Sequence, residues 1–383
     1  MTPAARLSAA IACLDRIMAG TSIDVALTNW GRASRYAGSG DRHAVRDLVF
    51  DALRCKRSYA ALGGGKTGRG LILGALRDAG LDPDKFFTGE GHAPDVVGAD
   101  EAGTVPQDNA ALDCPDWLAP QLQSSLGADF APVMMALRRR APVFLRVNTV
   151  KTDIAMAQSK LCADGIETRA HLLSKTALEV IEGARKIQNS AAYLTGLIEL
   201  QDASSQAVVD QLPLQDGMRV LDYCAGGGGK ALAMAARAQI TLFAHDAAPN
   251  RMRDLPDRAA RAGVAVTISD TPSKSAPYDL IITDVPCSGS GSWRRDPSGK
   301  WALTPAKLAD LCTIQADILT KVAPLLAPRG TLAYATCSML DAENIGQIRA
   351  FLARHPGWAV QSQRRFTPLE CGDGFFIALL TRV

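Results

Sequence analysis

Two cysteines follow apolar segments that read as buried strands, and a thiolate is a strong nucleophile. Cys287 stands in DVPCSGSG after the apolar segment at 278–284, and Cys337 ends the segment TLAYATC. For either cysteine alone, an inert buried thiol is an equally good interpretation. Two cysteines at the ends of two strands would lie at the sheet edge where such folds bind ligands, and this favours covalent chemistry.

A glycine-rich loop provides a candidate nucleotide site in the same region. The loop sequence, DYCAGGGGK, offers backbone and side-chain contacts from Cys224, Ala225, Gly226, Gly227, Gly228, Gly229 and Lys230. Glycines after a first strand let the backbone approach a nucleotide closely, although a tight turn without a ligand has the same pattern. The next strands end at Asp246, Asp270 and Asp284, where carboxylates suit a nucleoside. S-adenosylmethionine and NAD fit this pattern almost equally.

The cysteines distinguish the two cofactors. Carbon 5 of cytosine is too electron-poor to attack a methyl donor, but a thiolate that adds to carbon 6 makes carbon 5 nucleophilic. Methyl transfer, proton removal from carbon 5 and elimination of the thiol complete the reaction. Asp284 is placed to donate a proton to the ring nitrogen, which requires a raised pKa or a relay. Lys230 is available to hold the base or to depress a thiol pKa. A dehydrogenase needs no cysteine pair, so we expect S-adenosylmethionine.

At these residues the chain resembles the Nol/Nop/Sun family of RNA cytosine-5 methyltransferases, particularly its RsmB-type rRNA enzymes. The family patterns D-x-C-A-A-P-G-G-K-T, D-A-P-C-S-G-x-G and Y-x-T-C-S stand here as DYCAGGGGKA, DVPCSGSGS and YATCS, within about 145–383. The resemblance implies that Cys337 is the nucleophile and that Cys287 assists product release. Since DNA cytosine methyltransferases attack from a Pro-Cys motif, the two roles are open to exchange. The resemblance also implies cofactor contacts from residues 224–230, Asp246, Asp270 and Asp284.

The chain departs from the family pattern at the glycine loop. Gly226 and Gly227 replace Ala-Pro, and Ala231 replaces Thr. A change from Pro to Gly raises the entropy lost when the loop is ordered, so we expect weaker cofactor affinity with activity retained. Two alternatives stay open. The altered loop favours an RNA-binding or ribosome assembly factor with the methyltransferase fold and little catalysis, and a Rossmann oxidoreductase would leave both cysteines unexplained.

The elements expected around these motifs belong to an α/β fold. From Arg219, apolar strands alternate with helices, which predicts a parallel, doubly wound sheet covered on both faces. We therefore expect a Rossmann-like class I methyltransferase domain over 201–383 that ends in a β-hairpin. Its longest helix is predicted at about 305–326, with Thr304 as N-cap and with Pro328 and Gly330 closing it.

Two smaller regions precede this domain. Residues 143–200 predict a small α+β module, which corresponds to the RNA-binding module of the family. Residues 1–135 predict an all-α domain that loosely resembles the NusB-like RNA-binding domain of the rRNA enzymes. The helices of this part are expected near 3–18, 23–36, 41–62, 71–79 and 115–140, with a long loop at 81–116.

Charge is distributed unevenly in the N-terminal part. Residues 1–77 hold twelve Lys or Arg against five Asp or Glu, and residues 78–130 hold one against eleven. The asymmetry favours contact with an anion such as nucleic acid, although two solvated helix faces explain it equally well. We expect single-stranded RNA, because the target base must leave its stack, and rRNA rather than tRNA from the resemblance. Candidate RNA contacts are Arg294, Arg295, Lys300, Trp301, Arg138, Arg139, Arg140 and Arg146.

Composition excludes several other classes of protein. The 383 residues are 47% hydrophobic and 21% charged, with a net charge of +3, as in ordinary globular proteins. No apolar run reaches the length of a membrane span, and Asp15 and Arg16 interrupt the signal-like N-terminus, which instead predicts an amphipathic helix. The nine cysteines form no C-x-x-C pair and no zinc spacing. We expect a cytoplasmic monomer without disulfides or structural metal.

Overall fold

The computed structural model describes residues 1–383, which form two compact units. Unit 1 comprises Met1–Arg140 and Trp293–Ala302, and unit 2 comprises Ala141–Ser292 and Leu303–Val383. The short segment 293–302 therefore joins unit 1, although the chain on both sides of it belongs to unit 2. Unit 2 contains both the small α+β module and the sheet that carries the two cysteines.

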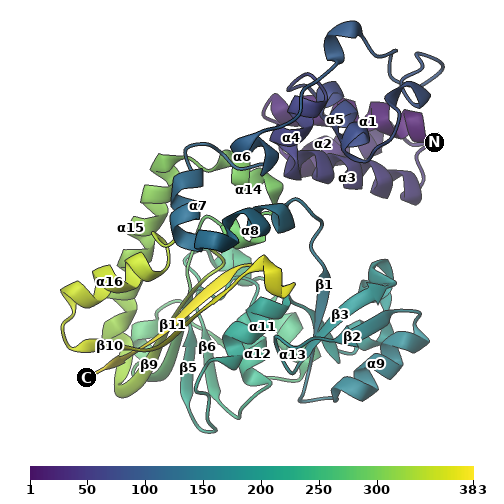
Figure 1. The fold of residues 1–383 in the computed structure, drawn as a ribbon. Coiled ribbons are helices and arrows are strands. Elements are labelled where there is room, and N and C mark those ends of the chain that lie inside the picture. The colour runs from purple at the N-terminus through teal and green to yellow at the C-terminus, as the bar shows by residue number, and fades with distance from the viewer. The chain divides into compact units, whose positions relative to one another are not determined.

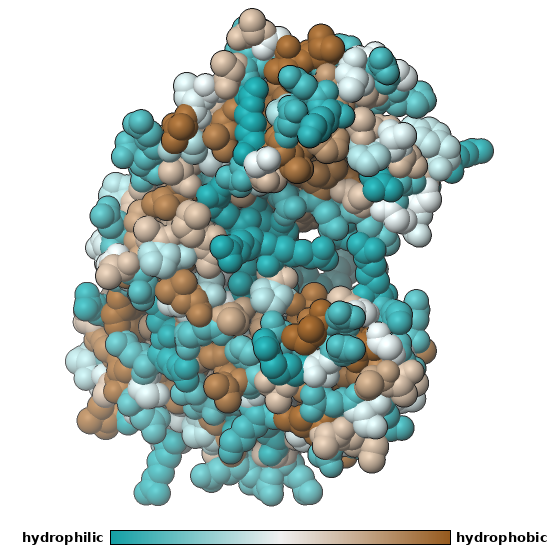
Figure 2. All heavy atoms as spheres, turned by 45° about the vertical axis from the view of Figure 1, so that its right-hand side comes forward, coloured by the Kyte–Doolittle hydropathy of each residue, from teal (hydrophilic) through white to brown (hydrophobic).

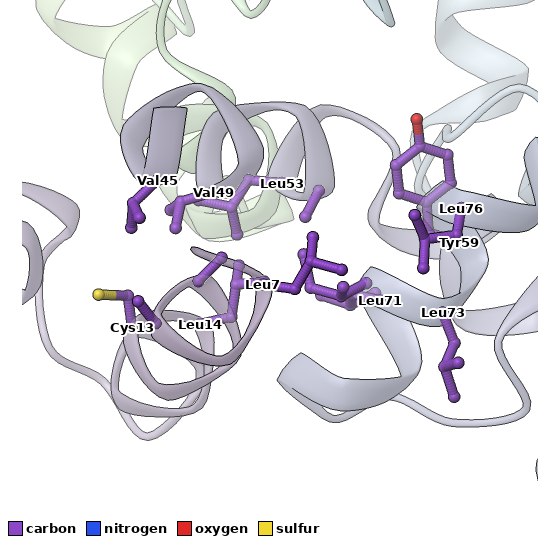
Figure 3. Close-up of a cluster of buried hydrophobic side chains, with 14 of the residues drawn as sticks. Leu7, Cys13, Leu14, Val45, Val49, Leu53, Tyr59, Leu71, Leu73 and Leu76 are labelled. Atoms are coloured by element: carbon purple, nitrogen blue, oxygen red, sulfur yellow. The ribbon is translucent and has the colours of Figure 1, made fainter. Parts of the chain in front are cut away.

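Unit 1 begins with a bundle of five helices, where the sequence predicts four (Figure 1). These are α1 (Pro3–Met18), α2 (Ile23–Ala33), α3 (Ser39–Arg54), α4 (Lys56–Leu62) and α5 (Gly68–Asp78). In Figure 3, Val45 and Val49 of α3 face Leu7 and Leu14 of α1, and all four side chains are buried. The helix expected at 41–62 is divided at Cys55, which ends α3.

A long segment of short elements completes unit 1. It contains α6 (Asp108–Ala111), α7 (Ala119–Leu126) and α8 (Phe130–Leu137), with 3-10 turns η1 (Pro83–Lys85), η2 (Ala99–Glu101) and η3 (Gly127–Asp129). The helix expected at 115–140 is interrupted at Gly127, whose φ of +56° ends α7. Helix α14 (Pro297–Ala302) from the distant segment, green in Figure 1, packs against α3.

The sheet of unit 2 has seven strands in the order β10-β11-β9-β8-β5-β6-β7. The strands β5 to β9 are parallel, whereas β11 runs antiparallel to both β9 and β10 and forms the expected terminal hairpin. The order reverses at β5, which has β6 on one side and β8 on the other. Their bounds are β5 Arg219–Asp222, β6 Thr241–Ala244, β7 Thr267–Ile268, β8 Tyr278–Asp284, β9 Leu326–Thr336, β10 Trp358–Phe366 and β11 Phe375–Arg382.

Helices cover both faces of this sheet, which confirms the doubly wound architecture. Alternate residues of each strand point to opposite faces, so Val220 packs with α11 and α12 while Leu221 packs with α15 and α16. The helices of unit 2 are α11 (Ala203–Asp210), α12 (Gly229–Ala235), α13 (Leu255–Ala262), α15 (Pro305–Val322) and α16 (Ile345–Arg354), with turns η5 (Pro249–Met252), η6 (Pro272–Ser275), η7 (Ser290–Ser292), η8 (Ala323–Leu325) and η9 (Pro368–Glu370).

The predicted end of the longest helix is wrong. Thr304 caps α15 as expected, but the helix ends at Val322, and Pro328 and Gly330 lie inside β9. The register between β8 and β9 is irregular between Leu326 and Thr331, and such irregularities are among the places in a sheet where proline occurs. Gly330 fits because a Cβ there would lie 2.9 Å from the carbonyl oxygen of Asp279.

The small module of unit 2 is an antiparallel sheet with helices on one face. Its order is β2-β3-β1-β4, and Leu145, Leu161 and Ile198 lie in its buried core. The elements are β1 Val143–Val147, α9 Ile154–Ala163, β2 Glu167–Ala170, β3 Ala177–Glu182, η4 Ala184–Asn189, α10 Ala191–Leu194 and β4 Ile198–Leu200. On the face drawn in Figure 2, hydrophobic residues form separate small groups among hydrophilic ones. None of the helices combines the length and the apolar character needed to span a membrane.

Candidate active site

The glycine loop leaves the sheet at the point where the strand order reverses. The loop connects β5 to α12, and the backbone φ angles of Gly226 and Gly228 are +51° and +78°. At Gly228 the positive φ would strain any other residue, and a Cβ there would lie 2.2 Å from Cδ1 of Leu255, so glycine is favoured. In doubly wound sheets, ligands bind outside the carboxyl ends of the strands at this switch point. The loop is thus placed as the sequence predicted.

Arginines from two neighbouring segments hold the carbonyl groups of this loop. The Arg258 guanidinium donates to the carbonyl of Gly227 and pairs with Glu199 at 2.9 Å. Arg146, a candidate RNA contact in the sequence, is instead buried and donates to the carbonyl of Gly229 at 2.7 Å. Side chains outside the loop therefore restrict its conformation, which its glycines alone would leave flexible.

The acidic residues after β6 and β7 differ in their surroundings. Asp246 is buried, accepts the backbone N–H of Gly226 at 2.9 Å and pairs with Arg251 at 3.1 Å. Asp270 is exposed beyond β7, and no hydrogen bond connects it to the loop. The structure thus joins Asp246, but not Asp270, to the glycine loop.

Asp222, at the end of β5, was not predicted as a site residue. It is buried, and neither of its carboxylate oxygens has a hydrogen-bond partner. Burial raises the pKa of Asp222 to about 7 against the opposing charge of Lys230. An unpartnered buried carboxylate is costly unless a ligand pairs with it, so it marks a candidate binding point. Its place as the first residue of the glycine motif was the available signal.

Lys230 and Asp284 form an ion pair between α12 and β8. The distance from Nζ to Oδ2 is 2.6 Å, and the Lys230 side chain is 9% exposed. Burial alone would lower the pKa of Lys230, but the charge and hydrogen bond of Asp284, with Asp222 and Cys337 adding, raise it. The hydrogen bond connects the buried ammonium directly to the carboxylate at the end of β8.

The two candidate catalytic cysteines lie side by side. Their sulfur atoms are 3.3 Å apart and both thiols are free. The pairing follows from the topology, because β8 and β9 are parallel neighbours whose carboxyl ends meet. The hydrogen bond with Cys337, burial and the nearby charges of Cys337 and Glu343 raise the pKa of Cys287 well above its usual value.

A buried carboxylate connects the two cysteine loops. Glu343 accepts hydrogen bonds from the Ser288 N–H at 2.7 Å, from Gln315 at 3.1 Å and from the hydroxyls of Ser288 and Ser338. Each serine directly follows a cysteine, so Glu343 fixes both thiols at once. No cation pairs with Glu343. No spacing rule relates Glu343 to the two cysteine motifs, so its role could not be predicted from the sequence.

The candidate RNA contacts in the segment 294–301 differ in their exposure to solvent. Arg294 and Lys300 are buried, which removes both from a solvent-facing RNA surface, whereas Arg295 is exposed and Trp301 is half-buried. Their burial follows from the packing of α14 against α3.

The three arginines at 138–140, before the first strand, also differ in their exposure and in their contacts within the protein. Arg138 pairs with buried Asp113 at 3.0 Å and serves the fold. Arg139 is exposed, and Arg140 is exposed but pairs with Asp47 at 3.1 Å. Only Arg139 and Arg140 therefore retain surface positions suited to the predicted role.

The strand order, the glycine loop at the reversal point and the acidic strand ends define a Rossmann-like methyltransferase domain. Residues 209–381 match the family described as 16S rRNA methyltransferase RsmB/F, and residues 114–188 match the ferredoxin-like domain of RsmF/B-like methyltransferases. Two regions of the chain thus match models of RsmB/F-type methyltransferases.

Individual proteins are similar to the chain in sequence or in fold. Ribosomal RNA small subunit methyltransferase B of Salmonella arizonae is 32% identical over 284 residues, which cover 70% of this chain and 66% of the relative. The chain thus spans slightly less than two thirds of the curated relatives' length. A methyltransferase homologue from Pyrococcus horikoshii has a TM-score of 0.64 at 24% identity, covering 72% of this chain and 97% of that chain. NSun6 from Pyrococcus horikoshii, solved with SFG, has a TM-score of 0.63 at 17% identity, covering 70% and 98%.

Proposed function

We propose that this protein methylates carbon 5 of a cytosine in ribosomal RNA, with S-adenosylmethionine as methyl donor and Cys337 as nucleophile. The observation that carries the proposal is the pair of thiols 3.3 Å apart, located at the strand ends beside the Lys230–Asp284 ion pair. The relatives' name, ribosomal RNA small subunit methyltransferase B, supports the substrate class.

The residues at the glycine loop fit S-adenosylmethionine. The unpartnered Asp222 carboxylate suits the ammonium of the methionine part, and the side-chain-free backbone at Gly226 and Gly228 leaves room for a closely bound ligand. Asp246 suits the ribose hydroxyls if Arg251 gives way. Bound there, the cofactor supplies an electrophilic methyl group. SFG, with which NSun6 was solved, is an analogue of this cofactor.

The surroundings of the thiols support the assignment of Cys337 as nucleophile. A raised pKa keeps Cys287 protonated, so its S–H can donate a hydrogen bond to a Cys337 thiolate. Lys230 adds positive charge near Cys337. The thiolate forms a bond to carbon 6 of the base. After methylation, loss of the carbon 5 proton to a base and cleavage of the S–C bond regenerate the thiolate, with Cys287 assisting release.

Lys230 and Asp284 act as a proton relay in this scheme. The Lys230 ammonium is hydrogen-bonded to Asp284, so a proton can pass through the carboxylate to the ring nitrogen as carbon 6 is attacked. The proton returns when the thiolate leaves.

The proposal includes the partner, the state of the target base and the oligomeric state of the protein. RNA is the partner, the target cytosine is unpaired, and the protein acts as a cytoplasmic monomer. Arg139, Arg140 and Arg295 are the exposed candidates for phosphate contact. The altered glycine loop keeps a catalytically weak assembly factor as the second candidate function.

The test is to trap the covalent intermediate. Cys287→Ala protein, expressed in cells and purified under denaturing conditions, is expected to carry covalently bound RNA, because release is blocked. The Cys287→Ala, Cys337→Ala double variant should carry none. An adduct on Cys337→Ala alone would exchange the two roles, and no adduct from any variant would favour the assembly factor.

A further inference from the structure

We propose that a cavity within unit 1 binds one nucleotide of a single-stranded RNA, with the base against Trp301 and the phosphate beside Lys56 and Lys66. The cavity has a volume of about 800 Å³ and lies among α4, the loop after it, the segment 100–104 and α14. It is separate from the cysteine site, all of whose residues belong to unit 2. That the nucleic acid is RNA rests on the proposed function.

Trp301 is a fixed wall of this cavity. Helix α3 ends at Arg54, so the last carbonyl groups of the helix lack partners within it. The Trp301 Nε1–H donates to the carbonyl of Leu53 at 2.7 Å, and the Lys300 ammonium donates to that of Arg54 at 3.0 Å. A cation at a helix C-terminus is also favoured by the helix dipole. The indole is therefore held in place before a ligand arrives, which lowers the entropic cost of stacking a base.

The cavity carries two lysines that lack acidic partners. Neither Lys56 nor Lys66 forms an ion pair or a hydrogen bond to a protein acceptor, and the Lys56 ammonium lies 5.7 Å from the centre of the Trp301 ring. Burial, with the repulsion of Lys66, lowers the pKa of Lys56. Arg57, by contrast, is held by Asp116 at 2.8 Å. Two unpaired ammonium groups that repel each other are stabilised by an anion between them, and a phosphate has that charge.

The rest of the lining favours a nucleotide over a more highly charged ligand. Small residues leave a smooth apolar floor, which suits the flat face of a base. At Gly64, φ is +76° and a Cβ would lie 3.1 Å from Glu101, so the loop can pass this close only with glycine. The carboxylate of Asp100 lies on the exposed rim and opposes a second negative charge, which disfavours a polyphosphate. The floor consists of Ala60, Ala61, Ala102, Gly103 and Ala110.

The experiment measures binding of a fluorescent single-stranded RNA of about 12 nucleotides to the full chain without cofactor, so that no turnover occurs. The Lys56→Met variant keeps the aliphatic part of the side chain and removes its charge. Lys66 is an exposed residue, so the Lys66→Ala variant loses no buried contact. Both variants should therefore fold. Each is expected to weaken binding about fivefold near 0.1 M salt and to reduce the salt slope by about 0.7. Lys85→Ala, an exposed lysine outside the cavity, is the matched control.

Photocrosslinking of an RNA that contains 4-thiouridine provides a second readout, with Trp301 as the expected attachment point. Unchanged affinity and salt slope in both lysine variants would overturn the proposal. The proposal would also be overturned if a polyglutamate peptide displaced the labelled RNA as effectively as unlabelled RNA does. The site would then recognise negative charge alone. Covalent trapping at Cys337 tests the proposed function separately, since these variants leave both cysteines intact.

Discussion

The loops that carry the cysteines and the loop that carries the glycines lie at the same sheet edge but are held in different ways. Buried hydrogen bonds to Glu343 fix the cysteine loops from inside the protein. The glycine loop is held at its two ends by single contacts from buried Asp246 and Arg146, and its middle, at Gly227, is held by the partly exposed Arg258.

The difference matches what each loop has to do. A bond between sulfur and carbon forms only in a narrow geometry, so the thiols gain from being fixed before the substrate arrives. A loop that admits a cofactor must open and close, and its glycines, with the partly exposed contact from Arg258, permit this at the expense of affinity. The comparison predicts that changes at the cysteine loops affect catalysis, whereas changes at the glycine loop affect cofactor binding.

The largest effect is expected from Glu343→Ala. The change leaves several buried donors without an acceptor, which should lower the free energy of unfolding by about 3 kcal/mol. Misplaced thiols should lower kcat about 100-fold. Cofactor affinity, measured by calorimetry, should stay the same, and Glu167→Ala on the exposed strand β2 is the control. A variant that loses cofactor affinity but keeps kcat would break the comparison.

Asp222 should make cofactor binding depend on pH. Its pKa of about 7 lies above its ordinary value of 3.8, so the ligand-free protein loses stability as pH rises between these values. A cofactor ammonium favours the ionised form, and the affinity should therefore increase about five- to tenfold from pH 6 to pH 7.5. In Asp222→Asn the affinity should be weaker and independent of pH. A wild-type affinity that is flat over this range would exclude Asp222 as the ammonium partner.

Arg258→Met should affect binding and spare the chemistry. The variant keeps the aliphatic stem but loses the contacts to Gly227 and Glu199, so the free loop becomes less ordered. We expect the Kd for the cofactor to rise about fivefold, with kcat at saturating cofactor within about twofold of the wild type. Arg253→Met, on an 81% exposed side chain nearby, is the control. Equal loss in both variants would assign the effect to surface charge.

The smallest effect is expected from Gly227→Ala. Its φ is not in the left-handed region, but a Cβ would lie 3.0 Å from Nη1 of Arg258. In wild-type protein, stiffening of the loop and crowding of Arg258 should nearly cancel. In the Arg258→Met background only the stiffening is left, so the Kd should fall about threefold. Equal effects in the two backgrounds would show that Arg258 and the loop are not coupled.

The sequence by itself determined the chemistry-bearing edge of the sheet. Apolar strands alternating with helices predict a parallel sheet, and Cys287 and Cys337 follow two of its strands. Because parallel strands bring their carboxyl ends to one edge, the meeting of these thiols with Lys230 and Asp284 could be expected. These inferences need only local patterns, which a sequence records directly.

The tertiary structure alone decided how these groups are held. Glu343, Arg258 and the indole of Trp301 act through contacts with residues far away in the chain, and no local spacing encodes such contacts. Pro328 and Gly330 read locally as a helix end, yet the pairing of flanking residues with β8 places both inside β9. Burial of Lys300 likewise depends on which segment covers it, because solvent exclusion arises only when distant surfaces pack together.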